Sequence, residues 1–423
     1  MRILAALAVA CALAIGSAHA SDRFAVHAGH LVDVDAGSVL DDVYIVIDGD
    51  RVAAVQKTAP ADLRIEDWSR YTVLPGLIDC HTHLIGDIES SSVTAPLTSS
   101  QARDVLMGVK NARATLMAGF TTVRDVGTYR AFTDVALRNA INDGTVIGPR
   151  MAVAGAYITV SGGGGEVTGL APDVVVPAEF RRGVANNESE IRQRVREILG
   201  GGADFIKIIA TGAVLTNGTN PGAAEYSEAE IHAAVDEAAK YGTYVAAHAH
   251  GAEGIKNAIR AGVRSIEHGS LMDDEGVALM KKYGTYLSAD IYNGDYIAEV
   301  GKRDGWDAEI LRKNDETTET QRVAFRKAAK AGVKIVFGTD AGVYPHGWNA
   351  NQFPYMVRYG LTPMQAIQAA TINSAELMRW EKNVGAIQPG KYADMIAVDG
   401  DPLADISVLK NVAKVMKGGA IIK

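Results

Sequence analysis

Residues 74–84 read Leu-Pro-Gly-Leu-Ile-Asp-Cys-His-Thr-His-Leu, an apolar run that ends in two histidines. Side chains of a β-strand point alternately to its two faces, so His81 and His83 point the same way from one strand end. Two imidazoles placed in this way can hold one metal ion. The alternative is a pair of solvated histidines after a core strand, and the rest of the chain decides between the two interpretations.

Seven further apolar segments resemble this strand and alternate with helical patterns. The strand candidates are 74–82, 121–126, 150–158, 205–210, 244–249, 264–268, 285–291 and 333–339. The helical patterns lie at 101–117, 188–199, 227–241, 251–261, 273–283 and 317–331, and Ser227 with Glu230 resembles a capping box. This alternation predicts an α/β fold, a (β/α)8 barrel of the TIM type. A doubly wound sheet has weaker support, because no G-x-G-x-x-G follows the first strand.

The two ends of the chain have a different texture from the middle. Short alternating segments with turn residues fill residues 24–73, for example 42–49 and 51–55, and they return at 393–398 and 412–416. We therefore expect a small β-sandwich domain assembled from both termini, residues 21–73 plus 381–423. The barrel is expected to occupy residues 74–380.

The N-terminus is typical of a secretory signal. One arginine, a short apolar stretch and Ala18-His19-Ala20 predict a cleaved signal peptide at residues 1–20 and a periplasmic or secreted protein. Ala8 disfavours a lipoprotein anchor at Cys11. The mature chain would keep Cys80 alone, so it would have no internal disulfide. Because Cys80 precedes His81, it should point to the opposite side of the strand and pack in the core.

Composition narrows the class of partner. The formal net charge of −8 and the pI of about 5.7 argue against nucleic acid, which favours basic surfaces. Apart from the N-terminus we find no apolar span of about 20 residues, the length that a membrane helix needs. We therefore expect neither nucleic acid nor a membrane as a partner.

Ligand-type side chains end five of the eight predicted strands. The residues are His81, His83, Lys207, His248, His250, His268 and Asp340. In such barrels the carboxyl ends of the strands meet at one mouth, where the active site lies. Each residue has a structural alternative: a salt bridge for Lys207, a helix cap for His250 or Asp340, and a buried hydrogen bond for His268. Taken together, seven such residues indicate metal chemistry.

The chemistry of these residue types is coherent. Neutral imidazoles and carboxylates bind Zn²⁺ well, whereas an ammonium does not. If CO₂ carboxylates Lys207, the resulting N6-carboxylysine carries two anionic oxygens and suits a bridge between two divalent ions. Such ions lower the pKa of water and polarise a carbonyl. Asp340 would accept the proton from the attacking water and then pass it to the leaving amine.

The motifs PGLIDCHTH, FIKIIATG, VAAHAHG, SIEHG, FGTDAG and the late Gly385–Asp394 resemble the amidohydrolase superfamily over nearly the whole mature chain. The chain looks like the dipeptidase and carboxypeptidase-like branch related to imidazolonepropionase, and like bacterial hydrolases of ochratoxin A, which cut an amide next to phenylalanine. The resemblance implies that His81, His83 and Asp340 bind a first metal. It also implies that Lys207 bridges and that His248 and His268 hold a second.

The resemblance leaves His250 for the substrate, although it and His248 can exchange roles. Related enzymes carry Gly-Gly-His-Gly in the loop after the third strand, whereas this chain has Gly162–Gly165, which we expect to be a flexible active-site loop. The missing histidine leaves space for a bulky acyl group. The candidate substrate residues, each with a packing or surface alternative, are His250, Gly163, Gly164, Tyr226, Tyr292, His346, Arg124 and Tyr129.

These expectations combine into one hypothesis: an exported, binuclear zinc hydrolase that cleaves an amide bond next to a C-terminal amino acid. The substrate would be a dipeptide or an N-acyl amino acid such as ochratoxin A, and the family implies a homo-oligomer. A cyclic-amide hydrolase or a deaminase can use the same site. A non-catalytic periplasmic metal-binding protein is the alternative from another class, and the intact Asp340 argues against it.

Overall fold

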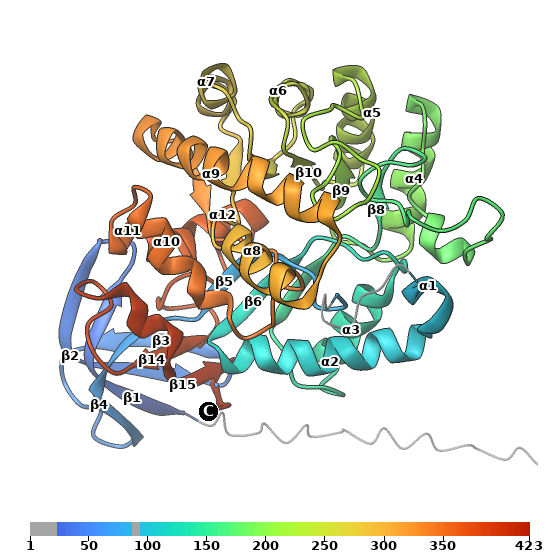
Figure 1. The fold of residues 1–423 in the computed structure, drawn as a ribbon. Helices are drawn as coiled ribbons and strands as arrows, with labels where there is room; N and C mark the ends of the chain where they lie inside the picture. Colours follow the sequence, from blue (N-terminus) through green and yellow to red (C-terminus); the bar gives the residue numbers. More distant parts are fainter. Residues whose placement is uncertain (1–22, 87–93) are drawn as a thin grey trace, which may run out of the picture.

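A parallel barrel forms the body of the molecule in the computed structural model, which describes residues 23–86 and 94–423 (Figure 1). The predicted signal peptide lies outside the described residues. Hydrogen-bonded strands run in the orders β5-β6-β7 and β8-β9-β10-β11-β12-β13. Their bounds are β5 Leu77–Thr82, β6 Phe120–Asp125, β7 Arg150–Val153, β8 Tyr157–Ile158, β9 Ile206–Ile209, β10 Val245–Ala249, β11 Ser265–His268, β12 Tyr286–Ser288 and β13 Ile335–Val336.

Backbone hydrogen bonds between the first and last strands close the barrel. The Cys80 N–H donates to the Phe337 carbonyl over 2.8 Å, and the Asp340 N–H donates to the His81 carbonyl over 2.8 Å. Thr82 and Ala341 form a parallel bridge one step further along. The predicted (β/α)8 fold class is confirmed.

The third barrel strand, predicted as one segment over 150–158, is broken in two. Gly155 takes a left-handed conformation with φ +73°, which favours glycine, and its N–H donates to the buried Asp134 carboxylate over 2.8 Å. The break lets β7 pair with β6 while β8 pairs with β9. Strand 3 therefore changes partner at Gly155.

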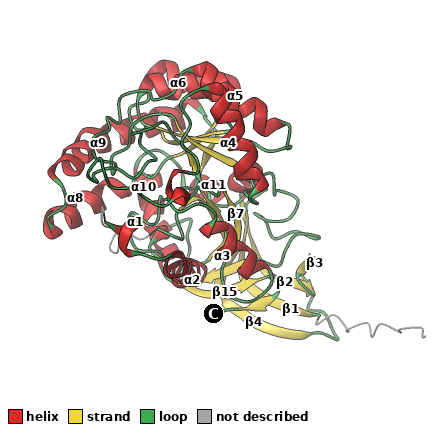
Figure 2. Cartoon of the chain, turned by 90° about the vertical axis from the view of Figure 1, so that its right-hand side faces the viewer, coloured by secondary structure: helices red, strands yellow, loops and turns green. Residues whose placement is uncertain are grey.

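Helices surround the barrel, as the two views show (Figures 1 and 2). Their bounds are α1 Ala95–Thr98, α2 Gln101–Met117, α3 Thr133–Asn142, α4 Glu188–Gly200, α5 Glu228–Ala239, α6 Ala252–Ala261, α7 Asp274–Tyr283, α8 Asn293–Asp304, α9 Ala308–Ala331, α10 Gln352–Arg358, α11 Pro363–Ala369 and α12 Ile372–Met378. Short 3-10 helices are η2 Ala178–Arg181, η3 Asn349–Asn351 and η4 Ile406–Lys410. The predicted capping box at Ser227 is confirmed.

Two differences from the predicted helices have a clear physical reason. Helix α9 begins at Ala308, whereas the prediction began at residue 317. The prediction was late because inward positions of the first turns hold the buried polar residues Lys313 and Asn314. Without apolar residues there, no helical period marks the segment. Helices α3 and α8 were not predicted, and their inward faces also contain polar or small residues, such as Asp134 and Gly294.

Strands from both ends of the chain form one seven-stranded sheet beneath the barrel (Figure 2). The order is β16-β15-β14-β4-β1-β2-β3, with bounds β1 Phe24–Asp33, β2 Ser38–Asp48, β3 Arg51–Gln56, β4 Arg64–Pro75, β14 Met395–Val398, β15 Val412–Lys417 and β16 Ala420–Ile421. The sheet curls, since Arg51 next to one edge bridges Tyr392 and the Val52 N–H donates to the Lys391 carbonyl. Trp68 and Met395 are buried in the core that it encloses.

The sheet and the barrel meet at a glycine. Strand β4 ends at Pro75 and β5 begins at Leu77, and the Gly76 N–H between them donates to the Asp394 carbonyl over 2.9 Å. A Cβ on Gly76 would lie 2.1 Å from the Thr121 hydroxyl, so only glycine fits this close approach. The predicted single strand 74–82 is thus two strands, one in each sheet. The division into domains at residues 73 and 380 stays a prediction.

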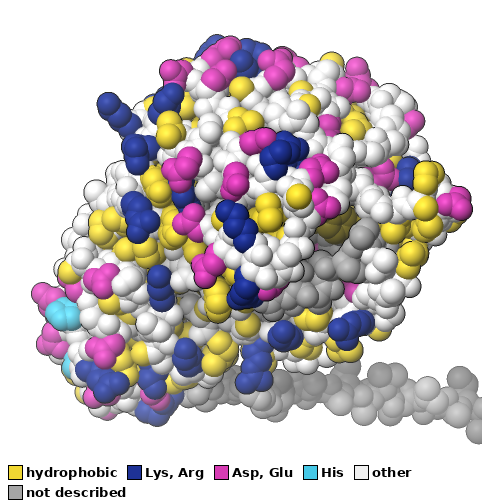
Figure 3. All heavy atoms as spheres, viewed as in Figure 1, with side chains coloured by type: hydrophobic (Ala, Val, Ile, Leu, Met, Phe, Trp, Pro, Cys, Tyr) yellow, Lys and Arg dark blue, Asp and Glu magenta, His cyan; other side chains and the backbone are white. Residues whose placement is uncertain are grey.

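The molecular face seen in Figure 1 has side chains of both charges. Figure 3 shows acidic and basic side chains interspersed over the described part of the face seen in Figure 1. Across residues 23–86 and 94–423, no helix combines the length and apolar character needed to cross a bilayer.

Candidate metal centre

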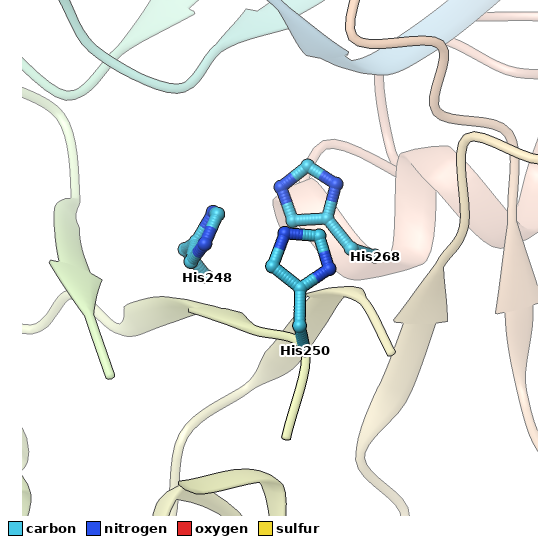
Figure 4. Close-up of side chains that lie close together, drawn as sticks. All are labelled: His248, His250 and His268. Atoms are coloured by element: carbon cyan, nitrogen blue, oxygen red, sulfur yellow. The ribbon is translucent and has the colours of Figure 1, made fainter. Parts of the chain in front are cut away.

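Three histidines converge at the carboxyl ends of β10 and β11. The imidazoles of His248, His250 and His268 have ring centroids 4.5 to 4.7 Å apart, and one nitrogen from each lies within 4.8 Å of the others (Figure 4). All three side chains are buried. Such a cluster matches the nitrogen ligands of a zinc ion.

A second group forms around the carboxylate of Asp340. Its Oδ1 lies 3.4 Å from His81 Nε2 and 3.1 Å from His83 Nε2. His268 shares this group, since His81, His268 and Asp340 offer ligand atoms that all lie within 4.8 Å of one another. The two groups therefore adjoin through His268, which is the arrangement that two neighbouring ions need.

Four of the five rings are held from behind through Nδ1. The partner of His81 is Glu267 at 3.0 Å, that of His83 is the Gly127 carbonyl at 2.8 Å, that of His268 is Asp290 at 3.0 Å and that of His250 is Ser270 at 2.7 Å. Nδ1–H donation leaves Nε2 as the ligand atom, and such outer partners fix ring orientation in metal sites.

His248 is held differently. Its Nε2 lies 3.3 Å from the Gly212 carbonyl, so this ring is bonded through the other nitrogen. His250 shares the Nδ1-bonded geometry of His81, His83 and His268, whereas the resemblance assigns ligation to His248. Both rings lie in one cluster, with centroids 4.6 Å apart.

Lys207 on β9 faces this cluster from inside the barrel. Its side chain is 2% exposed, and no other described side chain forms a hydrogen bond or ion pair with its Nζ. Burial lowers its pKa to about 8. A buried amine without a close acceptor is the form that reacts with CO₂, since its unprotonated fraction is the nucleophile.

A buried ion pair supports His81. Glu267 accepts from Arg124 Nη2 over 2.7 Å and from Ser265 Oγ over 2.5 Å, and Arg124 Nε donates to the Cys80 carbonyl over 2.6 Å. The sequence predicted Arg124 as a candidate substrate residue in the mouth, and this prediction was wrong. Arg124 is fully buried, because its guanidinium neutralises a carboxylate that would otherwise be costly there.

Two of the five described non-glycine residues with positive φ belong to this site. His268 has φ +70° and Asp340 has φ +58°, values that non-glycine residues rarely adopt. The bend at His268 ends β11 and lets two consecutive residues, Glu267 and His268, both serve the site. Strain of this kind persists at functional sites, where neighbouring contacts hold it.

The electrostatics favour the metal-binding forms of His81, His250 and Asp340. Burial lowers the pKa of His81, with a contribution from Lys207, and burial together with His268 lowers the pKa of His250 to about 3. Burial would lower the pKa of His83 as well, but the hydrogen bond to Asp340 and the charge of Asp340 raise it. Burial would raise the pKa of Asp340, but the charges of His81 and His83 hold it well below its usual value. Neutral imidazoles and an ionised carboxylate are the forms that bind metal, so the donor set fits divalent ions.

The loop after strand 3 is pinned, which corrects the expectation of flexibility. Gly163, Gly164 and Gly165 are buried. The Gly164 N–H donates to both carboxylate oxygens of Glu225 over 3.0 Å, and its carbonyl accepts from the Thr216 hydroxyl over 2.6 Å. A Cβ on Gly164 would lie 3.0 Å from the Thr211 carbonyl oxygen, so the loop is packed for glycine.

The other predicted substrate residues divide into core and rim. Tyr226 is 2% exposed and its hydroxyl donates to the Ala185 carbonyl over 2.6 Å, so it packs in the core rather than in the mouth. His346 Nε2 lies 3.0 Å from the carbonyl of Gly86, close to the His83 turn. Tyr292 precedes the first residue of α8 without capping it through its side chain, and its ring packs edge-on against Tyr344.

Four supporting residues were not predicted: Glu267, Asp290, Asn293 and Asp79. Asn293 Nδ2 donates to Asp290 over 2.8 Å and to Asp340 over 3.2 Å, which joins the two groups. The Asp79 carboxylate accepts from Thr339 Oγ1 over 2.6 Å and so ties strand 1 to strand 8. Glu267 and Asp79 stand within two residues of predicted ligands, which is the signal that was available. Asp290 also had a signal, since it lies near the end of the predicted strand 285–291, whereas Asn293 begins helix α8, which was not predicted.

Fold and site together define a class of enzyme: a hydrolase on a (β/α)8 barrel with a histidine-rich site that can hold metal. The chain belongs to the amidohydrolase family, whose family model matches residues 72–422. This confirms the family expected from the motifs.

Three known proteins place the chain within the family. Ochratoxinase of Aspergillus niger is 32% identical over 435 residues, which cover 97% of this chain and 89% of that protein. The crystal structure of a Xaa-Pro dipeptidase with methionine bound in its active site superposes with a TM-score of 0.89 at 41% identity, covering 95% of this chain and all of that one (100%). Imidazolonepropionase of Streptococcus sanguinis is 23% identical over 400 residues, 87% of this chain and 86% of that protein.

Proposed function

We propose that this amidohydrolase cleaves an amide bond next to a C-terminal amino acid, in a dipeptide or an N-acyl amino acid such as ochratoxin A. The observation that carries the proposal is the convergence of five histidines, four of them buried, on Lys207 and Asp340. The likeness to an ochratoxinase and to a Xaa-Pro dipeptidase supports the choice of substrate, since the first name indicates action on ochratoxin and the second on a dipeptide.

Two divalent ions, Zn²⁺ by the chemistry of the donor set, fit this site. His81, His83 and Asp340 would hold the first, and His268 with His248 would hold the second, with His250 toward the substrate. Carboxylated Lys207 would bridge them: its neutral Nζ attacks CO₂, a C–N bond forms and one proton leaves. When bound, the ions would polarise the substrate carbonyl and lower the pKa of water.

Asp340 is placed to move the proton. Water attacks the carbonyl carbon, Asp340 takes the proton released, and the amide C–N bond breaks as Asp340 returns a proton to the leaving amine. Asn293 holds Oδ2 of Asp340 over 3.2 Å, which leaves Oδ1 beside His81 and His83. The ionised form of Asp340, which its neighbours favour, is the form that a general base requires.

A substrate panel tests the proposal. Zinc-loaded protein is assayed on N-acyl amino acids and dipeptides in which the acyl group and the C-terminal residue vary separately, and on cyclic ureides and aminated heterocycles. We expect cleavage of the first set, loss of activity with a chelator, and recovery with Zn²⁺. Turnover of the ureides or heterocycles alone would identify a cyclic-amide hydrolase or a deaminase. No turnover with stoichiometric metal would favour a binding protein.

We also propose, from the sequence, export through the N-terminal signal and assembly into a homo-oligomer. The signal is tested by N-terminal sequencing of the secreted protein, for which we expect Ser21 as the first residue. Light scattering of the purified protein tests assembly.

A further inference from the structure

A single asparagine bridges two carboxylates that face the metal-binding groups. Asn293 Nδ2 donates to Asp290 Oδ2 over 2.8 Å and to Asp340 Oδ2 over 3.2 Å. An amide nitrogen carries two hydrogens, so the two bonds use both of them. Asn293 is 6% exposed and is the first residue of α8. One buried amide therefore ties the segment after strand 7 to the segment after strand 8.

The charges that this amide faces fix its orientation. Burial would raise the pKa of Asp290, but the charge of His268 and the hydrogen bond to it lower this pKa to about 2. Asp340 also has a pKa well below its usual value. Two ionised carboxylates accept hydrogen bonds and repel an oxygen atom, so the nitrogen of the amide faces them. Among the described residues the oxygen Oδ1 of Asn293 has no hydrogen-bond partner, so its two bonds to the carboxylates account for an amide at this position.

Asp290 connects Asn293 to the second metal-binding group. Its Oδ1 accepts from His268 Nδ1 over 3.0 Å and from Gln321 Nε2 over 2.8 Å, while its Oδ2 accepts from Asn293. Gln321 also donates to the His268 carbonyl over 3.2 Å, so it holds the backbone that has the positive φ. A continuous chain of hydrogen bonds therefore runs from His268 through Asp290 and Asn293 to Asp340.

At the other end of this chain, Asn293 restricts the rotation of Asp340. The amide occupies Oδ2, whereas Oδ1 lies 3.4 Å from His81 Nε2 and 3.1 Å from His83 Nε2. The two carboxylate oxygens therefore differ, since one faces the histidines and the other faces the amide. This orientation matters for a group that binds metal and moves a proton, because a displacement of about 1 Å can cost about 10²-fold in rate.

Other contacts anchor helix α8, so the role of the Asn293 side chain can be separated from that of the fold. Asn314 Nδ2 of α9 donates to the Gly294 carbonyl over 3.0 Å. Tyr296 and Val300 of α8 pack in a buried apolar cluster. Loss of the Asn293 amide should therefore leave the helix in place.

We infer that Asn293 is a positioning residue that links the two metal-binding groups. It orients Asp340 for metal binding and proton transfer, and it fixes Asp290, and with it the His268 ring, relative to Asp340. The part that concerns proton transfer rests on the proposed amide hydrolysis, whereas the link between the two groups does not.

The first test compares Asn293→Leu with Asn314→Leu. Both variants remove a buried amide that bonds near the start of α8, but only Asn293 reaches the carboxylates. For zinc-loaded Asn293→Leu on N-acetyl-phenylalanine we expect kcat to fall about 10–100-fold, with KM within about threefold of wild type. Asn314→Leu should keep kcat within about threefold. Asn293→Ser, which has one hydrogen for two acceptors, should lose less than Asn293→Leu and replaces it if the leucine variant does not fold.

A double-mutant cycle with Asp340→Asn separates positioning from general damage. If Asn293 acts on turnover through Asp340, adding Asn293→Leu to Asp340→Asn should lower kcat by at most about twofold more. A residue that only stabilises the fold would give its full loss in both backgrounds. Additive losses, or equal losses in Asn293→Leu and Asn314→Leu, would overturn the inference.

Cobalt substitution tests the link between the two groups without turnover. The absorption bands of cobalt-loaded Asn293→Leu should differ from those of wild type, and competition with a chelator should show an affinity about tenfold lower. Asn314→Leu should match wild type in both measurements. An unchanged spectrum and affinity in Asn293→Leu would overturn the link. If wild type cleaves no amide, the proposed function fails, and the cobalt measurements alone then decide whether Asn293 positions the two groups.

Discussion

Different kinds of interaction hold the floor of the site, which the barrel strands form, and its rim, which the loops after strands 3 and 4 form. Beneath His81, the fully buried charges of Glu267 and Arg124 face each other at 2.7 Å on barrel strands. At the rim, backbone groups of the loops make the contacts: the Gly164 carbonyl accepts from the Thr216 hydroxyl, and the Gly164 N–H donates to the Glu225 carboxylate. Two opposite charges in a low-dielectric interior interact strongly and tolerate little displacement, whereas a hydrogen bond with at least one uncharged partner costs less to exchange.

Two tasks of the enzyme, the reaction and the selection of the substrate, are therefore assigned to different parts of the site. The floor sets which groups are charged and where their nitrogen and oxygen atoms point, and this determines the reaction. The rim sets only the shape and polarity of the surface that meets the substrate. Changes in the floor should therefore affect metal binding and turnover on every substrate, while changes in the rim should affect one substrate relative to another.

The largest effect is expected for Lys207→Ala at the floor. Loss of the bridging group should lower metal content and reduce kcat at least about a thousandfold, and short carboxylic acids should restore part of the activity. Metal analysis and rates with added acetate or propionate check this. Lys417→Ala is the matched control, since burial also lowers the Lys417 pKa to about 8 in the flanking sheet. Equal losses in both variants would contradict the special role of Lys207.

Asp340→Asn should come next. The amide keeps the shape of the side chain but cannot accept the proton, so kcat should fall about 10²–10⁴-fold on all substrates alike. Steady-state rates on several amides, with metal content measured in parallel, check the expectation. A loss confined to one substrate would contradict the role of Asp340 in proton transfer and indicate a role in substrate selection.

Glu267→Gln should weaken metal binding rather than chemistry directly. A glutamine cannot accept from His81 and from Arg124 at once, so the ring loses its fixed orientation, and metal affinity should fall about 10–100-fold. Competition with a chelator measures it, and the absorption spectrum of the cobalt-substituted protein reports the ligand geometry. The control is Glu237→Gln, which changes a buried carboxylate of α5 that pairs with Arg196 of α4. It should leave the metal affinity and the cobalt spectrum unchanged. Normal affinity in Glu267→Gln would show that the buried pair only stabilises the fold.

The smallest effect is a pH dependence of the metal-free protein. His250 has a folded pKa of about 3, below its unfolded value, so the unfolded state takes up the proton first as pH falls. The free energy of unfolding contributed by neutral His250 is complete above about pH 6.5 and is lost as pH falls toward 3. Between about pH 5.5 and 4, the free energy of unfolding in urea should fall with pH more steeply than that of His250→Asn, by about 1.4 kcal/mol per pH unit. Parallel slopes would contradict this.

The comparison also explains what the sequence revealed. Residues that end barrel strands, such as His81, His248 and Asp340, are visible because apolar periodicity marks each strand and a ligand-type residue follows it. The structure brings all seven predicted strand-end residues to one place. Helix α2 and the cap at Ser227 follow from local rules and were also predicted correctly.

The rim was predicted poorly because its contacts are not local in sequence. Tyr226 and Arg124 were assigned to the mouth, yet Tyr226 bonds to Ala185 and Arg124 bonds to Glu267, 143 residues away. The glycines of 162–165 indicate flexibility when read alone, and only Glu225 and Thr216 show that they are pinned. Loop conformation depends on contacts with residues that are distant in the sequence, and no sequence periodicity indicates those contacts.

The junction at Gly76 carries a consequence for the order in which the chain is made. Strand β4 leads directly into the strand that bears His81, and its edge pairs with β14 near the other end of the chain. Strands β1 to β4 can pair with one another early, but β4 meets β14 only when residues 395–398 have been synthesised. Until then β4 has an open edge, which is a site for wrong pairing. A chain that stops short of β14 would therefore expose that edge beside His81 and His83, the predicted ligands of the first metal.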